Sequence, residues 1–191
     1  MSVVKVVGMD PSMSNWGIAV GLLDVNQETL TIDHLAVLKP EVPSGKQVRQ
    51  NSKDLARAAE LYAGALLQVT GAKAIFVEAP VGSQSARAMA SYGICMGVLG
   101  ALRVAGHGFI ELTPTEVKLA GHGTKGATKQ QMIDWALRTH PEAPWPTFTR
   151  EGQTKVSAVK AEHMADAVAA IHAGLKTPEF TRMLPLLRQV A

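Results

Sequence analysis

The stretch VVKVVGMDPSMSNWGIAVGLL, residues 3–23, decides how the fold begins. A β-branched run from Val3 to Met9 ends at Asp10, and after a five-residue turn a second apolar run extends from Trp16 to Leu23. Apolar runs of this length, bounded by turn residues, are typical of β-strands. Because the turn between the two runs is tight, we expect an antiparallel hairpin with Asp10 beside its turn.

Beyond this hairpin, the pattern changes from strands to an alternation of helices and strands. A third strand is expected over residues 30–38, and a helix over 51–69 that Gly71 ends. The remaining elements are predicted as a strand over 74–77, a helix over 84–105, a strand over 109–112, a short helix opened by Thr113 and Pro114, and helices over 128–137 and 155–175. This order favours an α/β fold with a mixed five-stranded sheet flanked by helices on both faces.

The composition fits one compact domain over residues 1–191. Of these residues, 47% are hydrophobic and 18% charged, and a chain of this length buries about 70% of its unfolded surface. No apolar run approaches the ~18 residues of a membrane span, and the first residues lack a signal-peptide pattern. We therefore expect no membrane association and a cytoplasmic location, in a host cell if the source is viral. The proline-containing stretch 140–154 is expected to be an irregular loop, and 177–191 a short helix or tail.

Three carboxylates stand out by position: Asp10 ends the first strand, Glu78 ends the fourth, and Asp166 lies inside the last long helix. Ligands collect where the carboxyl ends of parallel strands meet, so Asp10 and Glu78 are expected to approach each other there. Helical spacing places His163 and Glu162 on the same face as Asp166. Taken singly, each carboxylate is more simply explained as a turn or surface residue, and His163 as a core histidine.

Together, these groups predict a metal site. Clustered carboxylates repel one another unless a cation neutralises them, and oxygen ligands suit Mg²⁺ or Mn²⁺. Such ions activate water and stabilise the leaving oxygen of a phosphodiester, so the chemistry indicated is hydrolysis of a nucleic-acid backbone.

A basic segment precedes the last helix. Residues 113–132 place lysines around a glycine-rich turn, as in a clamp for a phosphate backbone, although any solvated loop has a similar composition. The net charge of +3 is compatible with an anionic partner. The predicted DNA-binding residues are Lys118, Lys125, Lys129, Arg150, Lys155 and Lys160.

Four motifs in this order resemble the RuvC-like Holliday-junction resolvases of the ribonuclease H-like superfamily. They are VGMDPS at 7–12, FVE at 76–78, the basic segment with Lys118 and Lys129 eleven residues apart, and HMADAV at 163–168. The resemblance covers about residues 3–174. It implies a ribonuclease H-like fold and a Mg²⁺-dependent crossover junction endodeoxyribonuclease of DNA recombination and repair, acting as a homodimer on four-way junctions.

The same resemblance assigns roles to individual residues. It implies that Asp10, Glu78, His163 and Asp166 form the metal and catalytic group, with Glu162 as a further candidate metal ligand. Lys118 and Lys129 would contact junction phosphates, with Lys129 near the transition state.

The chain departs from the family pattern at two places. Many members carry an aspartate where His163 stands, and a nitrogen ligand makes Mn²⁺ more competitive. Val81 occupies the position where the family often has an aromatic residue that unstacks bases at the crossover. Trp145 and Phe148 are candidate replacements, although packing explains both residues more simply.

Two further questions stay open from the sequence. The small residues Gly93, Gly97 and Gly100 or Ala101 form a smooth stripe on one helix, which suits either a dimer contact or close packing on its own sheet. The alternatives to a junction resolvase are a ribonuclease H-like nuclease acting on RNA–DNA hybrids and a junction-binding module without catalysis. A phosphate-binding hairpin of the sugar-kinase type is less favoured, because the chain is short for two such domains.

Overall fold

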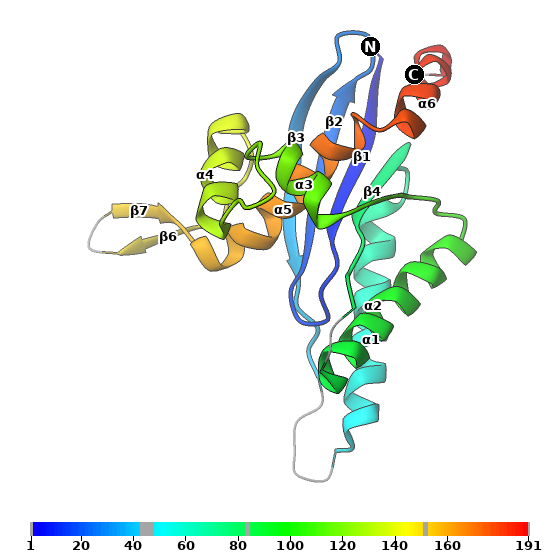
Figure 1. Cartoon of the computed structure of the whole chain (residues 1–191), viewed down its shortest axis with the longest axis vertical. Helices are drawn as coiled ribbons and strands as arrows, with labels where there is room; N and C mark the ends of the chain where they lie inside the picture. The colour runs from blue at the N-terminus through cyan, green and yellow to red at the C-terminus, as the bar shows by residue number, and fades with distance from the viewer. Residues whose placement is uncertain (1, 43–47, 83–84, 151–152, 191) are drawn as a thin grey trace.

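A mixed five-stranded sheet forms the centre of the computed structural model, which describes residues 2–42, 48–82, 85–150 and 153–190 (Figure 1). Strands β1 (Val3–Asp10), β2 (Trp16–Asp24) and β3 (Thr29–Leu38) form an antiparallel meander. Strand β4 (Ala74–Glu78) then pairs parallel with β1, and β5 (Ile110–Leu112) pairs parallel with β4. The strand order is β3-β2-β1-β4-β5, which confirms the predicted hairpin and mixed sheet.

Helices cover both faces of this sheet, as the sequence predicts. Helices α1 (Gln50–Val69) and α2 (Ala86–Val104) bury one face together with Val7, Met9 and Ile18. The opposite face, with Val4, Val6 and Phe76, packs in one core with α3 (Pro114–Ala120), α4 (Lys129–Thr139), α5 (Ala158–Gly174) and α6 (Pro178–Val190). Alternate residues of β1 thus enter opposite cores, because successive side chains of a strand point to opposite faces.

Helix α5 lies unusually close to the sheet because glycines face it. A Cβ atom built on Gly8 would lie 2.0 Å from the Ala167 carbonyl oxygen, and one on Gly17 would lie 2.0 Å from the His163 carbonyl oxygen. Both distances are far below van der Waals contact, so only glycine permits this approach. The approach holds α5, at His163 and Ala167, against the last part of β1 and the beginning of β2, where Asp10 lies.

The prediction of an irregular loop over 140–154 agrees with the structure for 140–146 and is wrong for 147–150 and 153–154. The segment leads from α4 into strands β6 (Thr147–Arg150) and β7 (Gln153–Val156), which pair antiparallel as a separate hairpin. Their threonine, phenylalanine and valine residues favour extended backbone, and the prolines lie before β6 instead of within it. Since β7 reaches Val156, α5 begins at Ala158 and not at Lys155.

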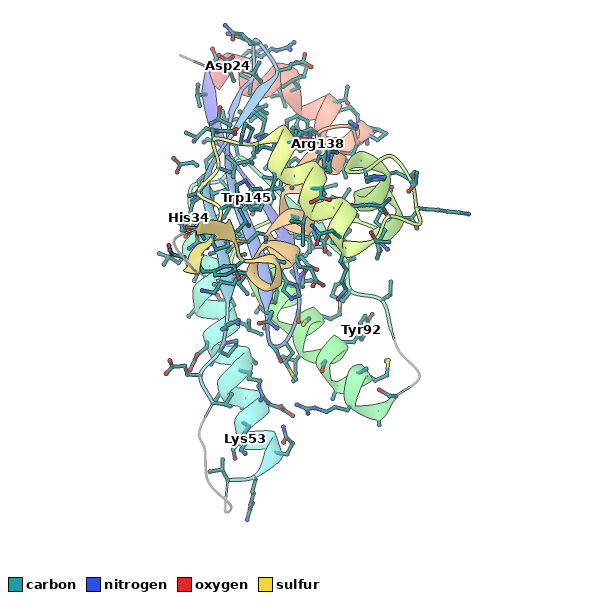
Figure 2. The ribbon with its side chains drawn as sticks, turned by 90° about the vertical axis from the view of Figure 1, so that its left-hand side faces the viewer. Asp24, His34, Lys53, Tyr92, Arg138 and Trp145 are labelled. Atoms are coloured by element: carbon teal, nitrogen blue, oxygen red, sulfur yellow. The ribbon has the colours of Figure 1, made fainter. Side chains whose placement is uncertain are left out.

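Trp145 lies between α4 and β6 and packs into the core (Figure 2). It is 9% exposed, and its indole N–H donates a 2.8 Å hydrogen bond to the His140 carbonyl oxygen. Packing is therefore the role that the structure gives it. Phe148 on β6 is 45% exposed.

The helix termini follow their local sequence signals. Thr113 and Thr128 each form a capping box with the residue three positions later, which starts α3 and α4. The predicted C-terminal helix is present as α6, with Phe180 and Leu187 buried. No helix in the described part of the chain combines the length and the hydropathy that a membrane span requires.

Candidate active site

The parallel pairing of β1 with β4 brings two of the predicted carboxylates to the same edge of the sheet. Met9 pairs with Val77, so Asp10 and Glu78, the next residues along each strand, end their strands side by side. Asp166 comes from α5, which contacts β1, β2 and β4. Asp10 and Asp166 both act electrostatically on Glu78, so the three carboxylates share one neighbourhood.

Burial raises the pKa of Glu78 to about 8, and the neighbouring charges of Asp10 and Asp166 add to the effect. Burial likewise raises the pKa of Asp166 to about 7, with Asp10 and Glu162 contributing. Each shift opposes the charged form, as expected for carboxylates that share one partly buried site. A cation there would relieve both the repulsion and the desolvation.

His163 forms a hydrogen bond with Asp10. Its Nδ1 lies 2.9 Å from Asp10 Oδ2, and the two side chains are 23% and 19% exposed. This hydrogen bond raises the pKa of His163, and the charges of Asp10, Glu162 and Asp166 act in the same direction. His163 is therefore a member of the carboxylate cluster and not a separate core histidine.

The donor chemistry of this cluster fits a hard divalent cation, because carboxylate oxygens are the ligands that Mg²⁺ and Mn²⁺ prefer. Within the residues that the structure describes, however, no three His, Cys, Asp or Glu side chains converge closely enough to count as a preformed metal centre. Asp10 Oδ2 is engaged by His163. Metal binding at these residues stays a prediction.

Two of the predicted lysines lie beside the carboxylates. Lys118 on α3 lowers the pKa values of both Glu78 and Asp166, which places its charge within reach of the cluster. Lys129, the first residue of α4, places its Nζ 2.6 Å from Glu162 Oε1. Its side chain is 78% exposed, whereas that of Glu162 is 25% exposed. Glu162 is thus paired with a lysine, a contact that its sequence position does not reveal.

The other predicted DNA-binding residues are not placed beside the carboxylates. Lys125 and Lys160 are exposed, and within the described part of the chain neither side chain forms an ion pair with the carboxylates. Arg150 and Lys155 belong to β6 and β7, but their side chains lie outside the described residues. The glycine-rich turn between α3 and α4 includes Gly123, whose φ of 90° favours glycine.

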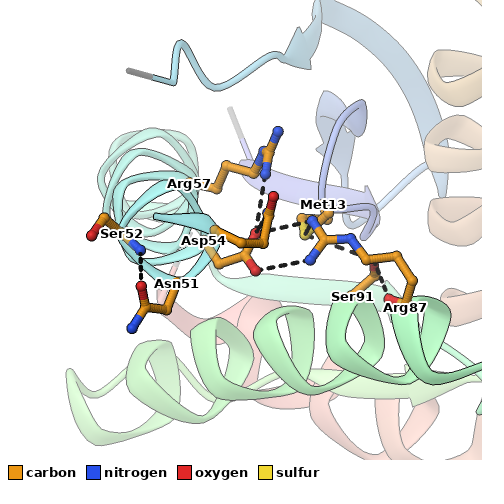
Figure 3. A network of polar contacts seen from close by, with 8 residues as sticks. Met13, Asn51, Ser52, Asp54, Arg57, Arg87 and Ser91 are labelled. Carbon is orange, nitrogen blue, oxygen red and sulfur yellow. Dashed lines mark hydrogen bonds and ion pairs between the residues drawn. The ribbon is translucent and has the colours of Figure 1, made fainter. Parts of the chain in front are cut away.

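A polar network that the sequence analysis missed lies beside the turn after Asp10 (Figure 3). Arg87 on α2 binds Asp54 on α1 through both carboxylate oxygens, at 2.8 and 3.0 Å, and Arg57 binds the same carboxylate at 3.0 Å. Arg87 Nη2 and the Ser91 hydroxyl each contact the Met13 sulfur, at 3.8 and 3.7 Å. Only the i,i+3 spacing of Asp54 and Arg57 was available as a sequence signal, since Arg87 is 33 residues away.

The glycine stripe on α2 faces away from the sheet. A Cβ atom on Gly93, Gly97 or Gly100 would have no atom within 4 Å, so the stripe does not seat the helix on its own sheet. Met89 and Met96 on the same helix are 41% and 37% exposed. Of the two sequence-based explanations, close packing on the sheet is therefore wrong.

Comparison with solved structures identifies the fold. The chain superposes on a structure described as Thermus thermophilus RuvC in complex with a Holliday junction substrate, with a TM-score of 0.61, 20% identity, and coverage of 89% of this chain and 92% of that one. A second Thermus thermophilus RuvC structure gives a TM-score of 0.59 at 22% identity, covering 88% and 92%. No protein-family model and no curated protein sequence matches the chain. Its element order, sheet topology and extent of superposition show that the chain has the RuvC-like form of the ribonuclease H-like fold.

Proposed function

We propose that this protein is a divalent-metal-dependent endonuclease that resolves four-way and other branched DNA junctions. The observation that carries the proposal is the cluster that Asp10 and Glu78, at the carboxyl ends of two parallel strands, form with Asp166 of α5. The raised pKa values of Glu78 and Asp166 are the electrostatic signature of a site suited to a cation. The RuvC-like fold supports branched DNA as the substrate class.

Each residue of the cluster has its own role in the proposal. Asp10, Glu78 and Asp166 supply oxygen ligands, and His163, oriented by its hydrogen bond to Asp10, supplies a nitrogen ligand. When bound, Mg²⁺ or Mn²⁺ would activate a water molecule and stabilise the leaving oxygen. Glu162 adds negative charge beside Asp166.

The lysines hold and stabilise the phosphate. Lys118 lies beside the carboxylates and is suited to contact the scissile phosphate or its neighbour. Lys129 is mostly exposed and is held near Asp166 by Glu162, so its ammonium group is available to charge that develops on the phosphate. Lys125, Arg150, Lys155 and Lys160 would extend the positive surface along the DNA arms.

A synthetic four-way junction incubated with Mg²⁺ or Mn²⁺ tests the activity. We expect the wild type to nick the junction and Asp10→Asn or Asp166→Asn to lose nicking, while both variants keep junction binding in EDTA. Asp33→Asn, at an exposed carboxylate on β3, is the matched control and should cut normally. Undiminished cutting by the Asp10 and Asp166 variants would refute the assignment of the site.

The same assay separates the alternatives. Preferential cutting of a linear RNA–DNA hybrid would favour a different ribonuclease H-like nuclease. Tight junction binding with no nicking under either metal would favour a binding module without catalysis.

A homodimer forms part of the proposal, because two symmetric nicks on one junction require two sites. The open face of α2, with its glycine stripe and the exposed Met96, is the surface that we assign to the dimer. Sedimentation should show a dimer for the wild type and a monomer for Met96→Glu. Leu186→Glu, on the exposed side of α6, places the same charge at a 63%-exposed leucine and should stay dimeric. A monomeric wild type would refute this assignment.

A further inference from the structure

Helices α4 and α5 lie side by side, run in the same direction and are bridged at both ends (Figure 1). At the active-site end, Lys129 Nζ lies 2.6 Å from Glu162 Oε1. At the far end, His140 Nε2 lies 2.7 Å from His172 Nε2. The two bridges are eleven residues apart along the chain at α4 and ten apart at α5, which is about 15–17 Å of helix. The histidine bridge therefore holds α4 at the end opposite to Lys129.

This histidine bridge is buried and connected on several sides. His140 is 3% exposed, and its Nδ1 lies 2.9 Å from Glu142 Oε1. The same carboxylate oxygen accepts the Ile32 N–H of β3 at 3.3 Å. The His140 carbonyl oxygen accepts the indole N–H of Trp145 at 2.8 Å. The end of α4 is thus held by β3, by α5 and by the segment that follows it.

The bridge depends on a single shared proton. Two imidazole nitrogens 2.7 Å apart need one proton between them, so one ring donates and the other accepts. Burial, with the charges of His140 and Lys176 acting in the same direction, lowers the pKa of His172 to about 4, so His172 is neutral near pH 7. If α4 slid or tilted away, His140 would lose this partner in the interior, where an unpaired polar atom is unfavourable. The bridge therefore resists such a movement.

The other contacts between α4 and α5 restrain this movement less. Met132 and Ala136 of α4 are buried in one core with Ala165 of α5. Contacts between small apolar side chains attract without fixing a register, because the hydrophobic effect has no direction. The ion pair of Lys129 with Glu162 is largely open to water on the lysine side, and such pairs stabilise little. The buried histidine bridge is thus the contact that sets where α4 lies along α5.

We infer that His140 and His172 are positioning residues for Lys129: their bridge holds α4 where the Lys129 ammonium group stands beside the carboxylate site. The inference rests on the proposed nuclease function, in which Lys129 stabilises charge that develops on the phosphate. Both histidines act through α4 from about 15 Å away along the helices. Loss of the bridge should slow cutting more than it weakens junction binding, because charge on the phosphate develops only in the transition state.

Single-turnover cutting of a four-way junction in Mg²⁺ or Mn²⁺ tests the bridge. His172→Leu removes the partner of His140, whereas His172→Gln keeps an amide that can donate or accept a hydrogen bond. We expect His172→Leu to cut about 10- to 100-fold more slowly while junction binding in EDTA stays within about twofold of the wild type. His172→Gln should cut at nearly the wild-type rate. Equal cutting by the two variants would overturn the inference.

Double variants show whether His172 acts through Lys129. Adding His172→Leu to Lys129→Met should slow cutting no further, whereas adding it to Lys118→Met should slow cutting by the same factor as in the wild type. Leu61→Ala is the matched control for lost stability, because Leu61 is fully buried on the other face of the sheet, away from α4. It should cut normally below its melting temperature. An equal loss in Leu61→Ala, or losses of His172→Leu and Lys129→Met that multiply, would overturn the inference.

Acetylation of Lys129 by acetic anhydride, followed by mass spectrometry, tests the bridge without nuclease activity. The hydrogen bond to Glu162 raises the pKa of Lys129, and only the unprotonated amine reacts. Relative to exposed Lys125, acetylation of Lys129 should therefore be severalfold faster in His172→Leu than in the wild type or His172→Gln. Unchanged acetylation in His172→Leu would overturn the inference. A wild type that cuts no junction while this difference persists would overturn only the proposed nuclease function.

Discussion

Replacing Gly17 by alanine is the sharpest test of how α5 is positioned. The new Cβ atom would lie 2.0 Å from the His163 carbonyl oxygen, whereas ordinary contact begins at 3.4 Å, so the start of α5 must retreat by about 1.4 Å. Overpacking of this kind costs about 1–3 kcal/mol, which lowers the melting temperature of a protein of this size by about 2–12 °C. Because a shift of about 1 Å in a catalytic group costs about a hundredfold in rate, junction cutting should fall by that factor.

The assay pairs thermal unfolding with single-turnover cutting of a four-way junction. Gly108→Ala is the matched control, since its Cβ atom would meet nothing within 4 Å and its stability should stay within about 0.5 kcal/mol of the wild type. Junction binding in EDTA should change little in either variant, because α5 contributes only part of the basic surface. A Gly17→Ala protein that melts and cuts like the wild type would refute the close approach of α5 to β2.

Three further predictions concern charged and titrating groups. Glu162→Gln removes the 2.6 Å ion pair with Lys129, so kcat should fall severalfold with a smaller change in KM, and adding Lys129→Met should cause little further loss. In EDTA, the melting temperature should fall as the pH rises from 6.5 to 8, because folded Glu78 and Asp166, with pKa values of about 8 and 7, hold protons that the unfolded chain has already lost. Burial and the neighbouring His140 lower the pKa of His172 to about 4. Because His172 takes up a proton at a higher pH in the unfolded chain than in the folded one, the free energy of unfolding should fall as the pH falls from 6.5 toward 4. A His172→Gln variant should lose less stability over this pH range.

Each of these predictions has a result that contradicts it. Equal kcat values for wild type and Glu162→Gln would show that the ion pair does not position Lys129. A melting temperature that rises between pH 6.5 and 8 in EDTA, or one that Mg²⁺ and Mn²⁺ leave unchanged at pH 8, would contradict the carboxylate cluster as a cation site. If the melting temperature of the His172→Gln variant falls at acid pH as much as that of the wild type, a group other than His172 causes the acid destabilisation.

Much of the fold is encoded in local patterns. The apolar runs of β1 and β2, the helical spacing in α1 and the capping threonines before α3 and α4 each specify their element through neighbouring residues. These signals sufficed to predict a mixed sheet with helices on both faces. They failed over 147–150 and 153–156, where the weak β preferences of two short strands gain their stability by pairing with each other.

The candidate site was likewise predictable in part from local sequence. The sequence by itself placed Asp10 and Glu78 at strand ends and Asp166 on a helix, because strand ends and helix faces are local properties. Only the tertiary structure decided that His163 binds Asp10 across 153 residues and that Lys129 pairs with Glu162. Such contacts depend on how closely α5 and α2 pack against the sheet. That distance is set by the packing of whole elements, which no single stretch of sequence specifies.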